Sequence, residues 1–282
     1  MSDYIMLETI QLKDLRTHCN NLAKFLYHLD IKQDDTQWSE SAEWLEVASG
    51  IKKISFDMGS FNKDYGFCGF ADDYTNQRDN LLELYVTEIG IFNFIWGSLE
   101  AIIDIINPPN IPNLRGKINK SCNFISQNFH NHMPCYLDLT SLLYKSLNDI
   151  FGDVSEQFEI KPHVNISGIA LFAIYKVRNR LAHGALQFPY VDETDDSIGE
   201  NNKVELIQLC SRLVLLSIQM LLISFLKNTE FVFKFDFLGE IELGDPDVTD
   251  KTISLDSLLR SIHLIHDDDH DDPNQMEFNF NL

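Results

Sequence analysis

The chain has 282 residues, of which 44% are hydrophobic and only 13 are glycine and 8 proline, so its composition excludes disordered, collagen-like and low-complexity proteins. Its 43 acidic residues outnumber its 22 basic ones, and the net charge of −21 repels phosphate backbones at long range. This charge excludes a protein that coats nucleic acid nonspecifically.

The cysteines and the apolar segments indicate the cellular compartment of the protein. Five cysteines are scattered along the chain without a CxxC or CxxH pair, which argues against a disulfide framework or a zinc site. The first residues lack a basic segment followed by an apolar one, so no signal peptide is predicted. The longest apolar runs, 89–106 and 206–226, contain charged residues and are not expected to span a membrane. We therefore expect a cytoplasmic protein.

Hydrophobic spacing predicts a mainly α-helical fold that begins with a pair of helices within 4–30 and 39–50. Residues 54–77 are rich in glycine, aspartate and aromatic residues, which predicts a loop that could contain a short hairpin. Residues 1–77 are thus expected to form an N-terminal helical extension and loop.

A helical bundle is predicted over residues 78–228. Its first helix is expected at 79–106, where two prolines end it, and the others follow at 114–129, 136–151, 166–182 and 203–227. The last of these helices is apolar around most of its circumference and must be covered by neighbouring helices or by a second subunit.

The C-terminal region, 229–282, is expected to add a β segment, a short helix and an acidic tail. Phenylalanines alternate with other residues over 231–237, which predicts a strand, and the terminal EFNFNL could pair with it. Three histidines lie among aspartates in 261–272 and could bind a divalent metal, although such acidic runs are more often solvated tails.

Residues 160–191 stand apart because they contain no aspartate or glutamate. They include Lys161, Lys176, Arg178 and Arg180, and therefore form a local positive region that can accept an anion despite the net negative charge.

The sequence Tyr175 to Gly184 lies within this region and has a specific helical geometry. Tyr175, Asn179 and His183 follow each other at intervals of four, so Asn179 is expected to bond the His183 ring and fix its tautomer. Arg178 and His183 would diverge by about 140° on a continuous helix. The helix must therefore end here if both are to reach one ligand, and Gly184 suits that end.

The residues Arg178-Asn179-Arg180-Leu181-Ala182-His183 resemble the RNxxxH form of the Rx4-6H motif of HEPN domains. The resemblance extends over residues 78–228 and implies an α-helical bundle. HEPN ribonucleases occur in toxin–antitoxin, abortive-infection and CRISPR-linked systems. In them, two motifs from two subunits form one cleft that cleaves RNA by 2′-hydroxyl attack, without a metal or cofactor.

The resemblance implies roles for individual residues. His183 corresponds to the general acid or base, Arg178 to the residue that neutralises the scissile phosphate, and Asn179 to the orienting residue. Glu100 is the candidate for a supporting acid on an earlier helix. The RNA-binding candidates are Lys176, Arg180 and Tyr175. The tyrosine that some members place two residues after the histidine is Ala185 here, so control by its modification is not supported.

The sequence thus predicts a metal-independent endoribonuclease, active as a homodimer on RNA, in antiviral defence or as a toxin with an antitoxin or activator partner. Two alternatives remain open. A catalytically silent HEPN module could bind a nucleotide, RNA or protein partner through the same residues. A helical scaffold could use its acidic tail to recruit a basic partner. In the second case, Arg178 and His183 would merely cap and pack a helix end.

Overall fold

The protein is mainly α-helical, as predicted. A computed structural model describes residues 12–33, 37–55, 57, 59–61, 66, 69–130, 133–153, 158–190, 202–229, 232–234 and 252–265. Its helices are α1 (Leu15–Gln33), α2 (Gln37–Gly50), α3 (Gly69–Ile106), α4 (Lys117–Asn128), α5 (Tyr136–Phe151), α6 (Ile169–Ala182), α7 (Asn202–Leu226) and α8 (Leu255–Ser261).

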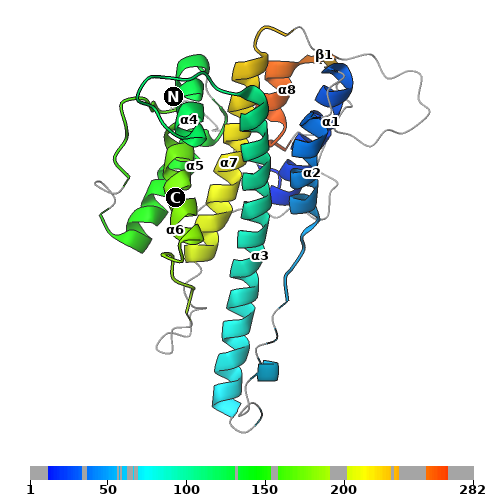
Figure 1. The fold of residues 1–282 in the computed structure, drawn as a ribbon. Helices are drawn as coiled ribbons and strands as arrows, with labels where there is room; N and C mark the ends of the chain where they lie inside the picture. The colour runs from blue at the N-terminus through cyan, green and yellow to red at the C-terminus, as the bar shows by residue number, and fades with distance from the viewer. Residues whose placement is uncertain are drawn as a thin grey trace, which may run out of the picture.

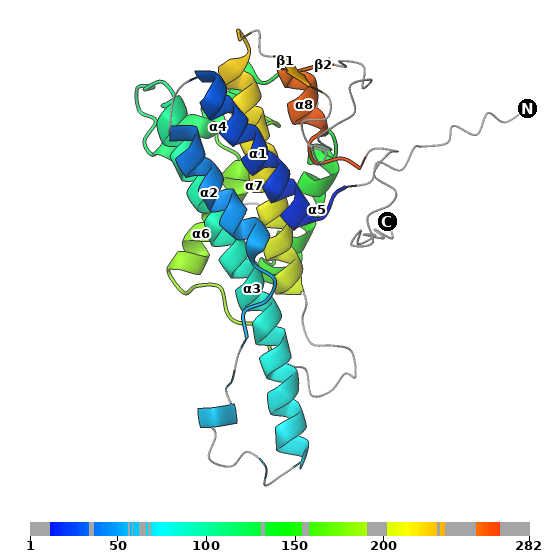
Figure 2. The same cartoon turned by 90° about the vertical axis from the view of Figure 1, so that its right-hand side faces the viewer.

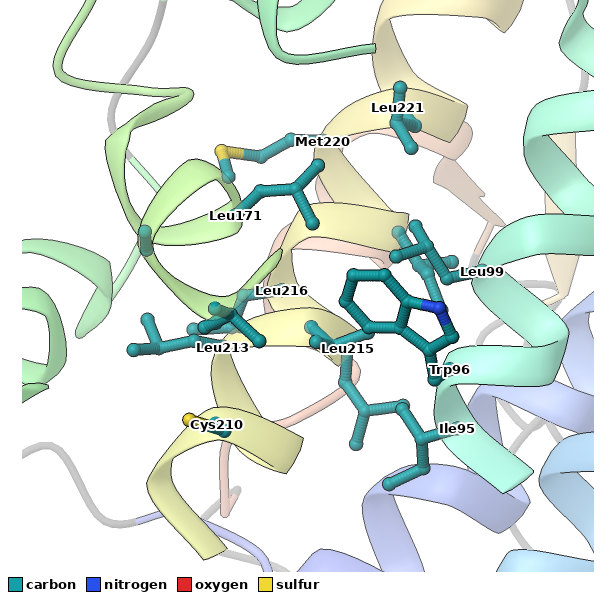
Figure 3. Packing of buried hydrophobic residues seen from close by; sticks show 14 of the residues in the cluster. Ile95, Trp96, Leu99, Leu171, Cys210, Leu213, Leu215, Leu216, Met220 and Leu221 are labelled. Atoms are coloured by element: carbon teal, nitrogen blue, oxygen red, sulfur yellow. The ribbon is translucent and has the colours of Figure 1, made fainter. Parts of the chain in front are cut away.

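Helix α7 forms the centre of the bundle, with helices of the same chain packed around it (Figure 1). Its residues Leu213–Met220 are buried almost completely, and leucines from α7 interlock with Trp96 of α3 and Leu171 of α6 (Figure 3). Burial of side chains of this size stabilises a fold by roughly 1.5–3 kcal/mol each. The apolar circumference of α7 is therefore covered within one chain, without a second subunit.

Helix α3 is the longest element, with 38 residues, and its N-terminal half extends beyond the rest of the bundle (Figure 1). It begins at Gly69, ten residues before the predicted start, so the boundary predicted at 77/78 lies inside a helix. It ends at Ile106 because Asn107 adopts a left-handed φ of 45° and two prolines follow. The described residues of 54–68 contain the 3₁₀ turn Gly59–Phe61 and no strand.

The N-terminal helices α1 and α2 belong to the same hydrophobic core as the bundle. They lie side by side against α3 and α7 (Figure 2). Trp38 of α2 is 1% exposed, and the buried Ser98 hydroxyl of α3 donates to the Ser41 carbonyl of α2 at 2.9 Å. The described helices of the N-terminal extension thus contribute to the same core as the bundle.

By length and composition, the stretch Asp72–Ile106 and helix α7 could each cross a membrane. The core helix of a soluble protein passes the same test, and 89% of the apolar window in α7 is buried inside the fold. This burial makes α7 weak evidence for a membrane protein, and the cytoplasmic location stays a prediction.

Part of the predicted C-terminal strand is present and pairs with a nearby segment. Strand β1 (Val232–Lys234) pairs antiparallel with β2 (Thr252–Ser254), with Phe233 opposite Ile253. The terminal EFNFNL, which could also pair with this strand, lies outside the described residues, as does the tail from residue 266 onwards. Residues 252–254 lead directly into α8, which packs on α7, so packing of α8 brings β2 to β1.

A buried chain of hydrogen bonds connects α1, α7 and α8. Arg212 of α7 donates through Nη1 to His18 Nδ1 at 2.8 Å, and His18 Nε2 lies 2.9 Å from Gln219 Oε1. The amide nitrogen of Gln219 lies 3.2 Å from His263 Nδ1, and His263 Nε2 lies 3.3 Å from the Pro134 carbonyl. Because Arg212 and the Gln219 amide can only donate to those Nδ1 atoms, both imidazoles are neutral and protonated at Nε2.

This arrangement opposes protonation of both histidines. Burial, followed by the nearby Arg212 guanidinium, lowers the pKa of His263 to about 4 and lowers the pKa of His18 well below its usual value. A proton added to Nδ1 of His18 or His263 would also point at the N–H donor of Arg212 or of Gln219, which is repulsive. Stability from these neutral rings is therefore fully present above the unfolded-state pKa of about 6.5 and is lost as pH falls towards the folded-state value.

We predict that the free energy of unfolding falls by about 2 kcal/mol between pH 7 and pH 5 from His263 alone, with a further loss from His18. Urea unfolding at the two pH values measures this change. The variant His263→Gln should show a smaller dependence on pH. An equal midpoint at both pH values in the native sequence would contradict the assignment of neutral imidazoles.

Candidate functional site

The candidate site lies at the C-terminal end of α6. The side of α6 that faces the core contains Leu171, Ile174 and Val177, all buried, which is the packing face expected from the 3.6-residue period. The opposite side therefore displays the polar residues of the motif, from Tyr175 to His183.

The helix ends where the sequence predicted. Its last residue is Ala182, His183 is the C-cap, and Gly184 adopts a left-handed φ of 65°. The amide of Ala185 donates to the Arg180 carbonyl at 2.8 Å and the amide of Gly184 to the Leu181 carbonyl at 3.1 Å, the bond pattern of a Schellman motif. A left-handed residue is required at this position, and glycine adopts that conformation without a Cβ clash.

One flank of α6 lies against Trp96 of α3, and this indole joins three of the predicted site residues. Trp96 Nε1 donates to Glu100 Oε1 at 2.7 Å. The Arg178 guanidinium carbon lies 5.9 Å from the centre of the same ring. The Tyr175 ring stacks on it with centroids 6.5 Å apart and planes 10° apart. Trp96 itself is buried between α3 and α7 (Figure 3).

Trp96 therefore stands between Arg178 and Glu100. Glu100, the candidate supporting acid, forms no ion pair with Arg178 among the described residues. Glu100 instead accepts from the nitrogen of the indole, and the guanidinium of Arg178 approaches the ring of the same indole. A guanidinium over an indole face is stabilised by the ring quadrupole and keeps its N–H groups available for another acceptor.

Asn179 and His183 lie in the middle of the polar side of α6. Asn179 is half-buried and His183 is exposed. The predicted bond between the Asn179 side chain and the His183 ring is absent from the described structure; instead, the His183 backbone amide donates to the Asn179 carbonyl at 3.0 Å. The backbone of His183 thus continues the helical bonding to Asn179, while the tautomer of the ring is not fixed by the Asn179 side chain.

Lys176 and Arg180 occupy the other flank of α6. The Arg180 guanidinium carbon lies 4.4 Å from the Phe151 ring centre, and Lys176 Nζ lies 5.6 Å from the Phe158 ring centre. Burial, followed by the nearby Lys161 ammonium, lowers the pKa of Lys176. These cations are thus separated from Arg178 by the width of the helix, with His183 between the two flanks.

The arrangement can bind an extended anion and exchange protons with it. An exposed imidazole is accessible to a ligand, and guanidinium or ammonium groups lie on either side of it, where successive phosphates of one strand could bind. Within the described residues, no group of three or more histidine, cysteine, aspartate or glutamate side chains is placed to hold a metal ion.

Trp96 is not among the site residues predicted from the sequence. A tryptophan four residues before Glu100 lies on the same helical face, and this spacing could have indicated the bond between them. Its contacts with Tyr175 and Arg178, nearly eighty residues away, had no local signal.

Comparison with known proteins found no matching family model, no matching curated protein and no matching solved structure.

Proposed function

We propose that this protein is a HEPN-type endoribonuclease that cleaves RNA at the end of α6. The observation that supports this most is the position of the motif. Arg178 rests on Trp96 at one flank, and His183 is exposed immediately after a glycine-terminated helix, with further cations on the opposite flank. An exposed imidazole and a guanidinium five residues before it on the same helix supply the two groups that phosphodiester cleavage uses.

In the proposed reaction, a His183 imidazole removes the proton from the 2′-hydroxyl, whose oxygen attacks the adjacent phosphorus. The bond from phosphorus to the 5′-oxygen breaks, and that oxygen receives a proton from a second histidine in its imidazolium form, which becomes neutral. The products are a 2′,3′-cyclic phosphate and a 5′-hydroxyl. Arg178 neutralises the charge that develops on the non-bridging oxygens, while Lys176 and Arg180 bind neighbouring phosphates.

Two imidazoles are available if two copies place their α6 ends across one symmetry axis, which is the homodimer that the resemblance implies. Because α7 is covered within the chain, we propose that the paired surfaces are formed around α6. Phe188 and Tyr190, which follow the motif, are exposed and would contribute apolar area to such an interface. A role in defence or as a toxin, with an antitoxin or activator, remains part of this proposal.

The test is RNA cleavage in the presence of EDTA. We expect fragments with 2′,3′-cyclic phosphate and 5′-hydroxyl ends, detected by mass spectrometry of a defined oligoribonucleotide. The same oligonucleotide with 2′-deoxyribose at the cleaved position should resist cleavage, because it lacks the nucleophile. Loss of cleavage in EDTA, or products with 5′-phosphate ends, would contradict this mechanism. Binding of RNA without cleavage would instead favour the silent module.

A further inference from the structure

Trp44 of α2 is an exposed tryptophan beside the candidate site. Trp44 is 44% exposed to solvent. The other two tryptophans of the chain, Trp38 and Trp96, are 1% and 4% exposed. Large aromatic side chains are usually buried because of the apolar area that they remove from water. Trp44 is therefore the one tryptophan of the three whose ring a ligand can reach from solvent.

The position of Trp44 is fixed by a glycine of α3. A Cβ added to Gly97 would lie 2.7 Å from Trp44 Cε3 and 2.9 Å from Cδ2, closer than atoms approach in proteins. The indole therefore lies directly on the α3 backbone, with the Phe94 ring centre 5.7 Å away. Contact of this kind holds the ring in one place while 44% of the residue remains exposed to solvent.

This place adjoins the catalytic candidates. Gly97 follows Trp96 directly on α3. Glu100 lies one turn further along the helix, and its angular position around the helix axis is between those of Trp96 and Gly97. Trp44 therefore covers one side of the exposed strip of α3 that contains Glu100. Trp96, with Arg178 and Tyr175 packed against it, closes the other side.

We propose that Trp44 stacks on a base of single-stranded RNA whose scissile phosphate lies at Arg178 and His183. This inference rests on the proposed function and extends it, because it assigns a substrate-binding role to the N-terminal helical pair. Trp44 is flanked on α2 by Glu40 and Glu43, both exposed. These carboxylates repel phosphates but not the uncharged face of a base, so the backbone must pass on the α6 side, where the cations are.

Tryptophan fluorescence tests the stacking separately from cleavage. The probe is a 2′-O-methyl oligouridylate of eight nucleotides, which cannot be cleaved because its 2′-oxygen has no proton to lose. We expect this probe to quench part of the emission of the native protein. The variant Trp44→Leu should lose the quenching, because the two remaining tryptophans are buried. The variant Trp38→Phe is the matched control and should retain it, because Trp38 is buried against Phe225 and, in the described part of the chain, contacts none of the candidate site residues.

Binding and cleavage measure the size of the effect. The probe should bind Trp44→Leu between about 5-fold and 100-fold more weakly than the native protein, the range expected for one base–aromatic stack. Trp44→Phe should restore most of the affinity. Gly97→Ala, which displaces the indole, should weaken binding in the same direction. Equal urea midpoints for native protein and Trp44→Phe would show that the fold is retained.

Each outcome separates this inference from the proposed function. If the protein cleaves RNA but Trp44→Leu binds the probe and cleaves normally, the stacking role is wrong and the nuclease stands. If the probe quenches Trp44 but no RNA is cleaved, the stacking role stands and the nuclease is wrong. A change in Trp44 emission with protein concentration in the absence of probe would mean that a second copy covers this residue, which also overturns the stacking role.

Discussion

Replacing His183 with alanine should lower the rate of RNA cleavage by about 10²–10⁴-fold, the usual contribution of a general acid or base. Among the polar side chains of the motif, the imidazole is the one suited to general acid–base catalysis, whereas a guanidinium is suited to binding phosphate. His183 is exposed, so its removal should change the free energy of unfolding by less than about 0.5 kcal/mol. Initial rates on a labelled oligoribonucleotide in EDTA give the cleavage effect, and urea unfolding gives the stability.

His130 provides a matched control for that variant. It is also an exposed histidine, but it follows α4 and is not part of the motif, so His130→Ala should cleave RNA at the native rate. A His183→Ala protein that remains folded and cleaves as fast as the native one would contradict the proposed mechanism.

Glu100 can be tested as a positioning residue with Glu100→Gln. The amide oxygen can still accept the bond from Trp96 Nε1, so this variant removes the charge and keeps the contact. If Glu100 acts by holding the indole beneath Arg178, Glu100→Gln should retain most activity, whereas Glu100→Ala should lose it mainly through a higher KM.

The largest effect on stability is expected from Gln219→Leu. This substitution nearly conserves volume, but it removes the hydrogen bonds of the Gln219 side chain to His18, His263 and the Leu259 carbonyl in the interior. Each buried polar group left without a partner costs roughly 1–3 kcal/mol, so we expect a loss of about 3–5 kcal/mol in the free energy of unfolding. Urea unfolding at pH 7.5 measures this loss. In hydrogen exchange, the backbone amides of α8 should be less protected in Gln219→Leu than in the native protein.

Gln77→Leu is the control for Gln219→Leu. Gln77 lies on α3 and is exposed, so the same chemical change should alter stability by no more than about 0.5 kcal/mol. Comparable stability of the two variants would mean that the bonds around Gln219 contribute little.

Local patterns predicted most of the secondary structure and the end of the motif helix. The helix expected at 136–151 matches α5 at both bounds, and the one expected at 203–227 differs from α7 by one residue at each end. The end of α6 was predicted from the angle between Arg178 and His183 and from Gly184. Helical periodicity, helix ends at proline and left-handed glycines are set by residues that are close together in the chain. They can therefore be recognised from the sequence alone.

Contacts between distant segments were decided only by the tertiary structure. Trp96 meets Arg178 and Tyr175, His18 meets Arg212, and β1 pairs with β2, each between residues too far apart in the sequence for a local pattern to relate them. The sequence could not decide whether α7 would be covered by its own chain or by a second subunit. That outcome depends on how all the helices pack together to remove apolar area from water, a property of the whole chain that no local pattern expresses.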